Sequence, residues 1–250
     1  MQKLSAKRIA GLIYRSVILL RGAIITALLV AGGLVFVGTL ISVRGDFMVK
    51  PDEFISMFSI LFLVLGLLFT FSIFREIQGD KTNHFYFLLP ATALEKVLAS
   101  WLLSNVMYIV VFSVFAFVVG QLGIALCSVF PSTDLHVLPI FSDTYWCLVK
   151  FYFFVQPAFL LGALTFTKNR IGKTLLAALV VVFGVFIYNM ILCFWFTGGA
   201  FDVFSSDPFS TEGFSLAQTD LSGIGGFLFS LVFGPMMLLA TYFKITEKEA

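Results

Sequence analysis

The residues best suited to chemistry in this chain are few and lie far apart. Gly172-Lys173-Thr174 matches the end of a phosphate-binding loop, in which a lysine and backbone N–H groups hold nucleotide phosphates. The first glycine of that motif would be residue 167, which is Thr167, and an apolar run follows at once, so the match is interpreted as a short turn. The sequence contains no HExxH or GxSxG motif, and its 3 cysteines lack metal-ligand spacing. We therefore expect no catalytic residue, no metal and no cofactor bound by this chain itself.

A polar segment at residues 75–101 separates two long apolar runs and is the second candidate for function. An apolar patch at 85–89 is followed by Pro90, and Thr92-x-x-Glu95 matches a capping box at the start of a helix. Loops in helical bundles usually have about 2–8 residues. The length, patch and cap therefore predict a short helix across a membrane face and then a capped helix. The alternative is a solvated loop.

The composition indicates which solvent surrounds most of the chain. Of the 250 residues, 60% are hydrophobic and 12% are charged, and the mean hydropathy is +1.03. A soluble domain has about 45–50% apolar and about 25% charged residues. The bilayer is therefore the expected surroundings, and lipid is an expected contact. No basic run indicates binding to nucleic acid.

The apolar runs predict an all-α integral membrane protein that forms one domain over residues 1–250. A membrane-spanning helix needs about 20 mostly apolar residues. Six stretches qualify, namely 22–43, 54–74, 98–126, 147–167, 174–197 and 222–243.

The charges predict the orientation of these spans. With the N-terminus in the cytoplasm, only Arg44, Lys50 and Lys150 of the 16 basic residues fall on the outer side. The positive-inside rule therefore favours cytoplasmic N- and C-termini. Residues 3–17 have basic and apolar side chains on opposite faces, which predicts an interfacial amphipathic helix before the first span. The alternative is a set of basic anchors with incidental periodicity.

The predicted spans carry no ionisable side chain in their middle, which argues against ion-coupled transport by this chain alone. Their polar side chains are amides, at Asn105, Gln121, Gln156 and Asn189. Each amide is compatible with a substrate pathway or with hydrogen bonding between helices, and helix packing is the favoured interpretation.

Two stretches of the polar segment resemble a family motif. They read Arg75-Glu76-Ile77-Gln78-Gly79-Asp80 and Leu88-Leu89-Pro90-Ala91-Thr92-Ala93-Leu94-Glu95-Lys96. This pattern resembles the cytosolic coupling helix between spans 2 and 3 of type-2 ABC transporter permeases, especially Bacteroides-like versions. The spacing from Gly79 to Leu88 is slightly longer than in the family, and Asp80 stands where threonine is common.

The resemblance implies a half-transporter in the cytoplasmic (inner) membrane of a bacterium. A second copy or a paralogous permease would complete a dimer, and separate ABC ATPase subunits would bind the ATP. The resemblance assigns contact with the ATPase to the coupling loop. Its residues would be Arg75, Glu76, Gly79, Phe85, Leu88, Leu89, Pro90, Glu95 and Lys96, with the apolar side chains central and the charged ones forming a polar rim.

Two other functions remain open. One is a membrane scaffold or sensor that recruits a cytosolic partner without transport. The other is a six-span substrate-capture subunit of an importer. The sequence does not identify a cargo.

Overall fold

The computed structural model describes residues 4–46, 51–74, 88–127, 142–166, 169–196 and 232–249. Within these ranges the regular elements are all helices, and none is a strand. The predicted all-α class is therefore confirmed. Four helical stretches are long and apolar enough to cross a membrane, and they are Ala6–Gly38, Ala93–Leu122, Asp143–Thr165 and Arg170–Tyr188.

The helices follow the apolar runs of the sequence closely. In chain order they are α1 (Ala6–Asp46), α2 (Pro51–Ile73), α4 (Ala93–Leu102), the π-helical turn η2 (Leu103–Met107), α5 (Tyr108–Cys127), α6 (Asp143–Thr165), α7 (Arg170–Phe196) and α9 (Gly234–Glu249). α4, η2 and α5 join end to end, so a single continuous helix runs from Ala93 to Cys127.

The described residues cover only part of the six predicted spans. The predicted span 54–74 corresponds to α2, of which the shorter apolar stretch Phe58–Ile73 is described with its side chains. The predicted span 222–243 lies partly outside the described residues, which resume at 232. Six spans therefore stay a prediction.

The predicted boundary between an interfacial helix at 3–17 and a span starting at 22 is wrong. α1 is one helix of 41 residues from Ala6 to Asp46. Residues 17–22 contain no proline, and their one glycine, Gly22, has open space around it. The helix continues through these residues, so the amphipathic segment and the predicted span belong to one helix.

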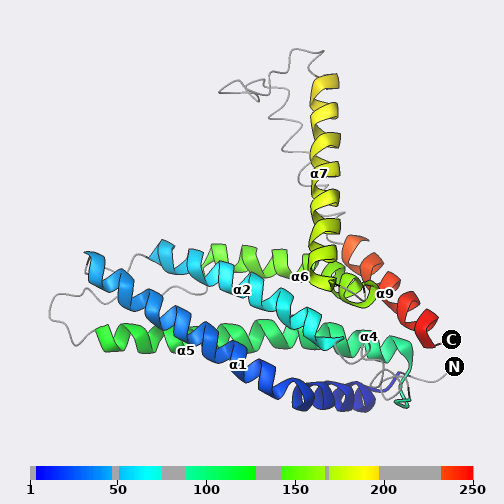
Figure 1. The fold of residues 1–250 in the computed structure, drawn as a ribbon, viewed down its shortest axis with the longest axis horizontal. Coiled ribbons are helices and arrows are strands. Elements are labelled where there is room, and N and C mark those ends of the chain that lie inside the picture. Colours follow the sequence, from blue (N-terminus) through cyan, green and yellow to red (C-terminus); the bar gives the residue numbers. More distant parts are fainter. Residues whose placement is uncertain are drawn as a thin grey trace.

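α1, α2, α6 and the continuous α4–α5 helix lie alongside one another as a bundle (Figure 1). The start of α1, the end of α2, the start of α4 and the end of α6 meet at one end of this bundle, where α9 packs against α6 and α4 (Figure 1). We call this end the junction. Helix ends next to segments that the basic residues predict to be cytoplasmic thus meet at one end of the bundle.

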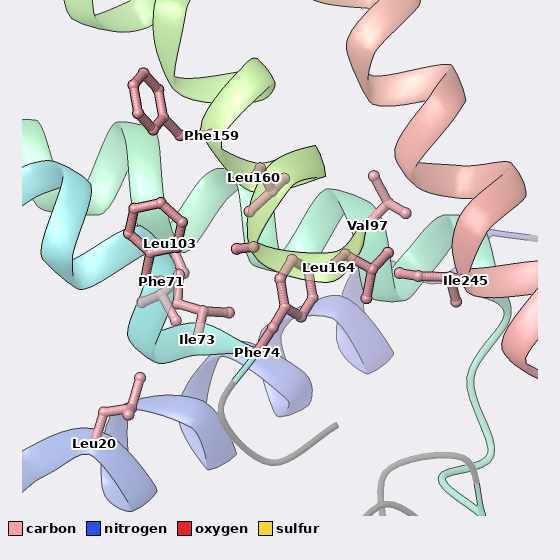
Figure 2. Close-up of a cluster of buried hydrophobic side chains, with 11 residues drawn as sticks. Leu20, Phe71, Ile73, Phe74, Val97, Leu103, Phe159, Leu160, Leu164 and Ile245 are labelled. Atoms are coloured by element: carbon pink, nitrogen blue, oxygen red, sulfur yellow. The ribbon is translucent and has the colours of Figure 1, made fainter. Parts of the chain in front are cut away.

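Two apolar clusters hold the bundle together. The cluster at the junction is drawn in Figure 2, and its fully buried members include Phe74 just after α2, Leu160 and Leu164 from α6, and Ile245 from α9. The second cluster lies farther along the bundle. There the ring of Phe58 contacts those of Phe112 on α5 and Tyr145 on α6, and the ring of Phe62 contacts that of Tyr152 on α6. In a bilayer such clusters stabilise the bundle by close van der Waals packing, because lipid chains are as apolar as the side chains.

α7 differs from the bundle helices. It leaves the junction beside the end of α6 and projects away from the bundle (Figure 1). Of its most apolar part, 6% is buried within this chain.

Candidate functional site

The start of α4 is shaped by the capping box that the sequence predicts. The Thr92 hydroxyl accepts a hydrogen bond from the Glu95 N–H at 3.3 Å, and Oε2 of Glu95 accepts one from the Thr92 N–H at 3.0 Å. Both bonds satisfy N–H groups that a helix start otherwise leaves unpaired. An N-cap of this type contributes about 1 kcal/mol. The position and direction of α4 are therefore fixed at its first turn.

Glu95 also connects α4 to the start of α1. Its Oε1 accepts a hydrogen bond from the Ser5 N–H at 2.9 Å, and its Oε2 lies 3.6 Å from Nη1 of Arg8. The Glu95 side chain is fully buried. Because a buried carboxylate is costly without partners, these contacts hold the two helix starts together.

The segment before the cap presents Leu88 outward, beside the exposed Pro90. Leu88 is 77% exposed, whereas Leu89 is half-buried and packs against the junction cluster. The Ala91 N–H donates to the Leu89 carbonyl at 2.7 Å, which closes a tight turn around the exposed Pro90. Leu89 therefore anchors the turn, and Leu88 is available for contact with another molecule.

Lys96 lies next to Glu95 and is also buried, with 1% of its surface exposed. The resemblance assigns both residues to a polar rim facing a partner. Both side chains are buried within this chain, and Glu95 helps to hold the junction together through Ser5 and Arg8. Contact of either residue with a partner stays a prediction. The other members of the predicted loop, Arg75, Glu76, Gly79 and Phe85, lie outside the described residues, as does the helix expected before Pro90.

Two basic side chains at the junction bind the ends of neighbouring helices. Nζ of Lys248 donates to the Leu164 carbonyl at 2.9 Å, and Nη1 of Arg170 donates to the Phe71 carbonyl at 3.4 Å. These carbonyls belong to the last turns of α6 and α2, where a cation also interacts favourably with the helix dipole. Burial, followed by repulsion from Lys244, lowers the pKa of Lys248. The surplus of basic residues in the segments predicted to be cytoplasmic was the only sequence signal for these contacts.

The predicted amides separate into different settings. Asn105 and Gln156 are fully buried, and Nδ2 of Asn105 donates to the Phe153 carbonyl at 3.3 Å. Nε2 of Gln156 donates to the Ser104 hydroxyl. Both are hydrogen bonds between the α4–α5 helix and α6, as the packing interpretation predicts. Gln121 is half-buried on α5, and the side chain of Asn189 lies outside the described residues.

The P-loop-like residues Gly172, Lys173 and Thr174 lie in the first turns of α7, so the short turn predicted for them is wrong. Thr174 packs against Gly162 of α6, whereas Gly172 and Lys173 are exposed. All three are helical and do not form a phosphate loop. Among the described residues, no group of three or more histidine, cysteine, aspartate or glutamate side chains could hold a metal ion.

Comparison of the sequence with models of protein families, with curated proteins and with solved structures found no match. The functional argument therefore depends on the geometry of the junction and on the sequence motif.

Proposed function

We propose that this chain is the membrane-spanning permease subunit of an ATP-driven ABC exporter. In this proposal the chain lies in a bacterial inner membrane with six spans and cytoplasmic termini, and it pairs with a second permease. Separate ATPase subunits bind and hydrolyse the ATP, so the chain is a transport subunit and has no enzymatic activity of its own. The observation that carries the proposal is the fastened start of α4, where Glu95 joins the capping box to Ser5 and Arg8.

Contacts at the junction support this proposal. Leu88 is exposed beside a rigid cap, and Leu89 ties the same turn to the apolar cluster shared by α2, α6 and α9. A partner that binds one arrangement of this turn more tightly would shift the bundle toward that arrangement. Displacement at Leu88 would reach α1 through Glu95 and the middle of the bundle through the continuous α4–α5 helix.

The burial of Glu95 separates two roles in the proposal, namely contact with the ATPase and positioning of the turn that makes this contact. Leu88 supplies apolar contact with the ATPase, together with Phe85 and the charged residues Arg75 and Glu76. Glu95 acts as a positioning residue, because its acceptor oxygens are engaged inside the chain.

The test is copurification of the full chain with an ATPase from its native membrane, followed by measurement of hydrolysis. The wild-type chain is expected to retain a P-loop ATPase, identified by mass spectrometry, and to stimulate its activity. Leu88→Asp is expected to reduce retention by about tenfold, as loss of an apolar anchor at an interface costs about 1–2 kcal/mol.

Leu4→Asp is the matched control, because Leu4 is 55% exposed at the start of the chain. It is expected to retain the ATPase at the wild-type level. A folded chain that retains no ATPase would contradict the proposal and favour the scaffold or sensor. Equal losses in both variants would contradict the assignment of Leu88.

A further inference from the structure

The π-helical turn Leu103–Met107 joins α4 to α5 within the helix from Ala93 to Cys127. A π-turn holds one residue more than the α-helical pattern, and such turns occur frequently at functional sites. The extra residue displaces the backbone ladder, so a carbonyl in the turn needs a partner from outside its own helix. Because the turn lies between the capped start of α4 and the apolar helix α5, it is a natural place for the helix to change register.

α6 supplies that partner. The Tyr152 hydroxyl donates to the Ser104 carbonyl at 2.8 Å, and both residues are buried. One turn farther along α6, Gln156 donates to the Ser104 hydroxyl, while Asn105 donates back to the Phe153 carbonyl. These reciprocal bonds form a polar seam between the π-turn and α6.

Polar atoms of this seam have no protein partner. They are Oδ1 of Asn105, Oε1 of Gln156 and, one turn earlier on the same helix, Nε1 of Trp101. Leaving a buried polar group unsatisfied costs about 1–3 kcal/mol. Such groups are normally satisfied by ordered water.

The chemistry of the seam identifies the ligand class. Amide oxygens require a donor and an indole N–H requires an acceptor, and water can serve as either. The named seam residues are all uncharged, and a buried cation without a counter-charge would carry a large desolvation cost. Water is the neutral molecule that normally satisfies such buried groups.

We propose that the seam between η2 and α6 is a water-binding site and that bound water and the Tyr152 hydroxyl together hold the π-turn as a hinge. Conversion of the turn to α-helix moves the extra residue along the chain. α4 then rotates by about 100° relative to α5, which is the angle of one residue in an α-helix. The use of this rotation as a relay from an ATPase rests on the proposed function, but the water site and the hinge do not.

The water site is tested in an experimental structure of the full chain in lipid that resolves ordered water. Water is expected within about 3 Å of Oδ1 of Asn105 and Oε1 of Gln156. Asn105→Leu together with Gln156→Leu should remove that density and leave the helices in place. Protein donors on both oxygens in the wild-type chain, or a seam without water, would overturn the site.

The hinge is tested by hydrogen–deuterium exchange of the full chain in nanodiscs without an ATPase. Tyr152→Phe removes only the hydroxyl and is expected to speed exchange in the amides of residues 104–109 by about fivefold, as one hydrogen bond contributes about 1 kcal/mol.

Tyr145→Phe is the matched control, because the buried Tyr145 hydroxyl also bonds α6 to α5, through Ser113 Oγ at 2.9 Å, but away from the π-turn. It should leave exchange at 104–109 unchanged. Equal effects of the two variants, or no effect of Tyr152→Phe, would overturn the hinge. Because no ATPase is present, this result is independent of whether the chain recruits one.

Discussion

α6 and α7 are neighbours in the chain and are both apolar enough to cross a membrane, yet their burial is very different. In α6, 44% of the most apolar part is buried within this chain, whereas in α7 the share is 6%. α6 contacts α2, α7, α9 and the π-turn, while α7 projects from the junction (Figure 1). Hydropathy therefore does not decide which helix becomes the centre of the bundle.

Small and polar side chains account for the difference. α6 carries Tyr152 and Gln156, which bond to the π-turn, and Gly162 and Ala163, which allow close approach of other helices. α7 instead has a run of large apolar residues from 179 to 183, all exposed. In a bilayer, apolar surface alone drives little helix association, whereas small residues and interhelical hydrogen bonds do.

The largest expected effect comes from overfilling a contact of α6. A side chain at Gly66 of α2 would place Cβ 2.6 Å from the Tyr152 ring and 2.8 Å from the Tyr108 ring. Gly66→Leu is therefore expected to destabilise the chain by about 3 kcal/mol or to prevent folding. Thermal unfolding in detergent, followed by size-exclusion chromatography, measures this.

Gly184→Leu is the control, because Gly184 on α7 has open space around it. It should unfold at the wild-type temperature. A large loss of stability in Gly184→Leu would contradict the contrast between α6 and α7.

An intermediate loss of stability is expected at the contact between α6 and α7. A Cβ at Gly162 would overlap the Thr174 side chain, so Gly162→Ala should cost about 1–3 kcal/mol. Thr174→Ala removes two of the obstructing atoms and should partly restore stability in the double variant. A double-mutant cycle from unfolding measurements gives the coupling energy, and strictly additive losses would show that the contact is absent.

The smallest expected effect is at the end of α6. Lys248→Met removes the donor to the Leu164 carbonyl and should cost about 1 kcal/mol. Lys244→Met breaks an exposed pair with Glu247 and should cost less, within about 0.5 kcal/mol. Equal unfolding midpoints for the two variants would mean that Lys248 does not stabilise the end of α6.

Local sequence patterns predicted much of this fold. The apolar runs predicted the main helices, and Thr92-x-x-Glu95 predicted a cap that depends on only four consecutive residues. The link from Glu95 to Ser5 was not predictable, because it joins positions 90 residues apart. The π-turn was missed for a similar reason, since its Ser104 carbonyl is satisfied by Tyr152 from another helix. The separate N-terminal helix was predicted from a change in polarity, but a change in polarity does not break a helix.

The most direct test of the central claim is photocrosslinking from Leu88 in native membranes. Leu88 at the junction is 77% exposed and Val182 on α7 is 68% exposed, so the two positions have similar access within this chain. A photoreactive residue at position 88 is expected to crosslink to a P-loop ATPase, and one at position 182 is expected to react with lipid or with another membrane protein. The absence of an ATPase crosslink at position 88, or equal ATPase crosslinking from both positions, would contradict the account.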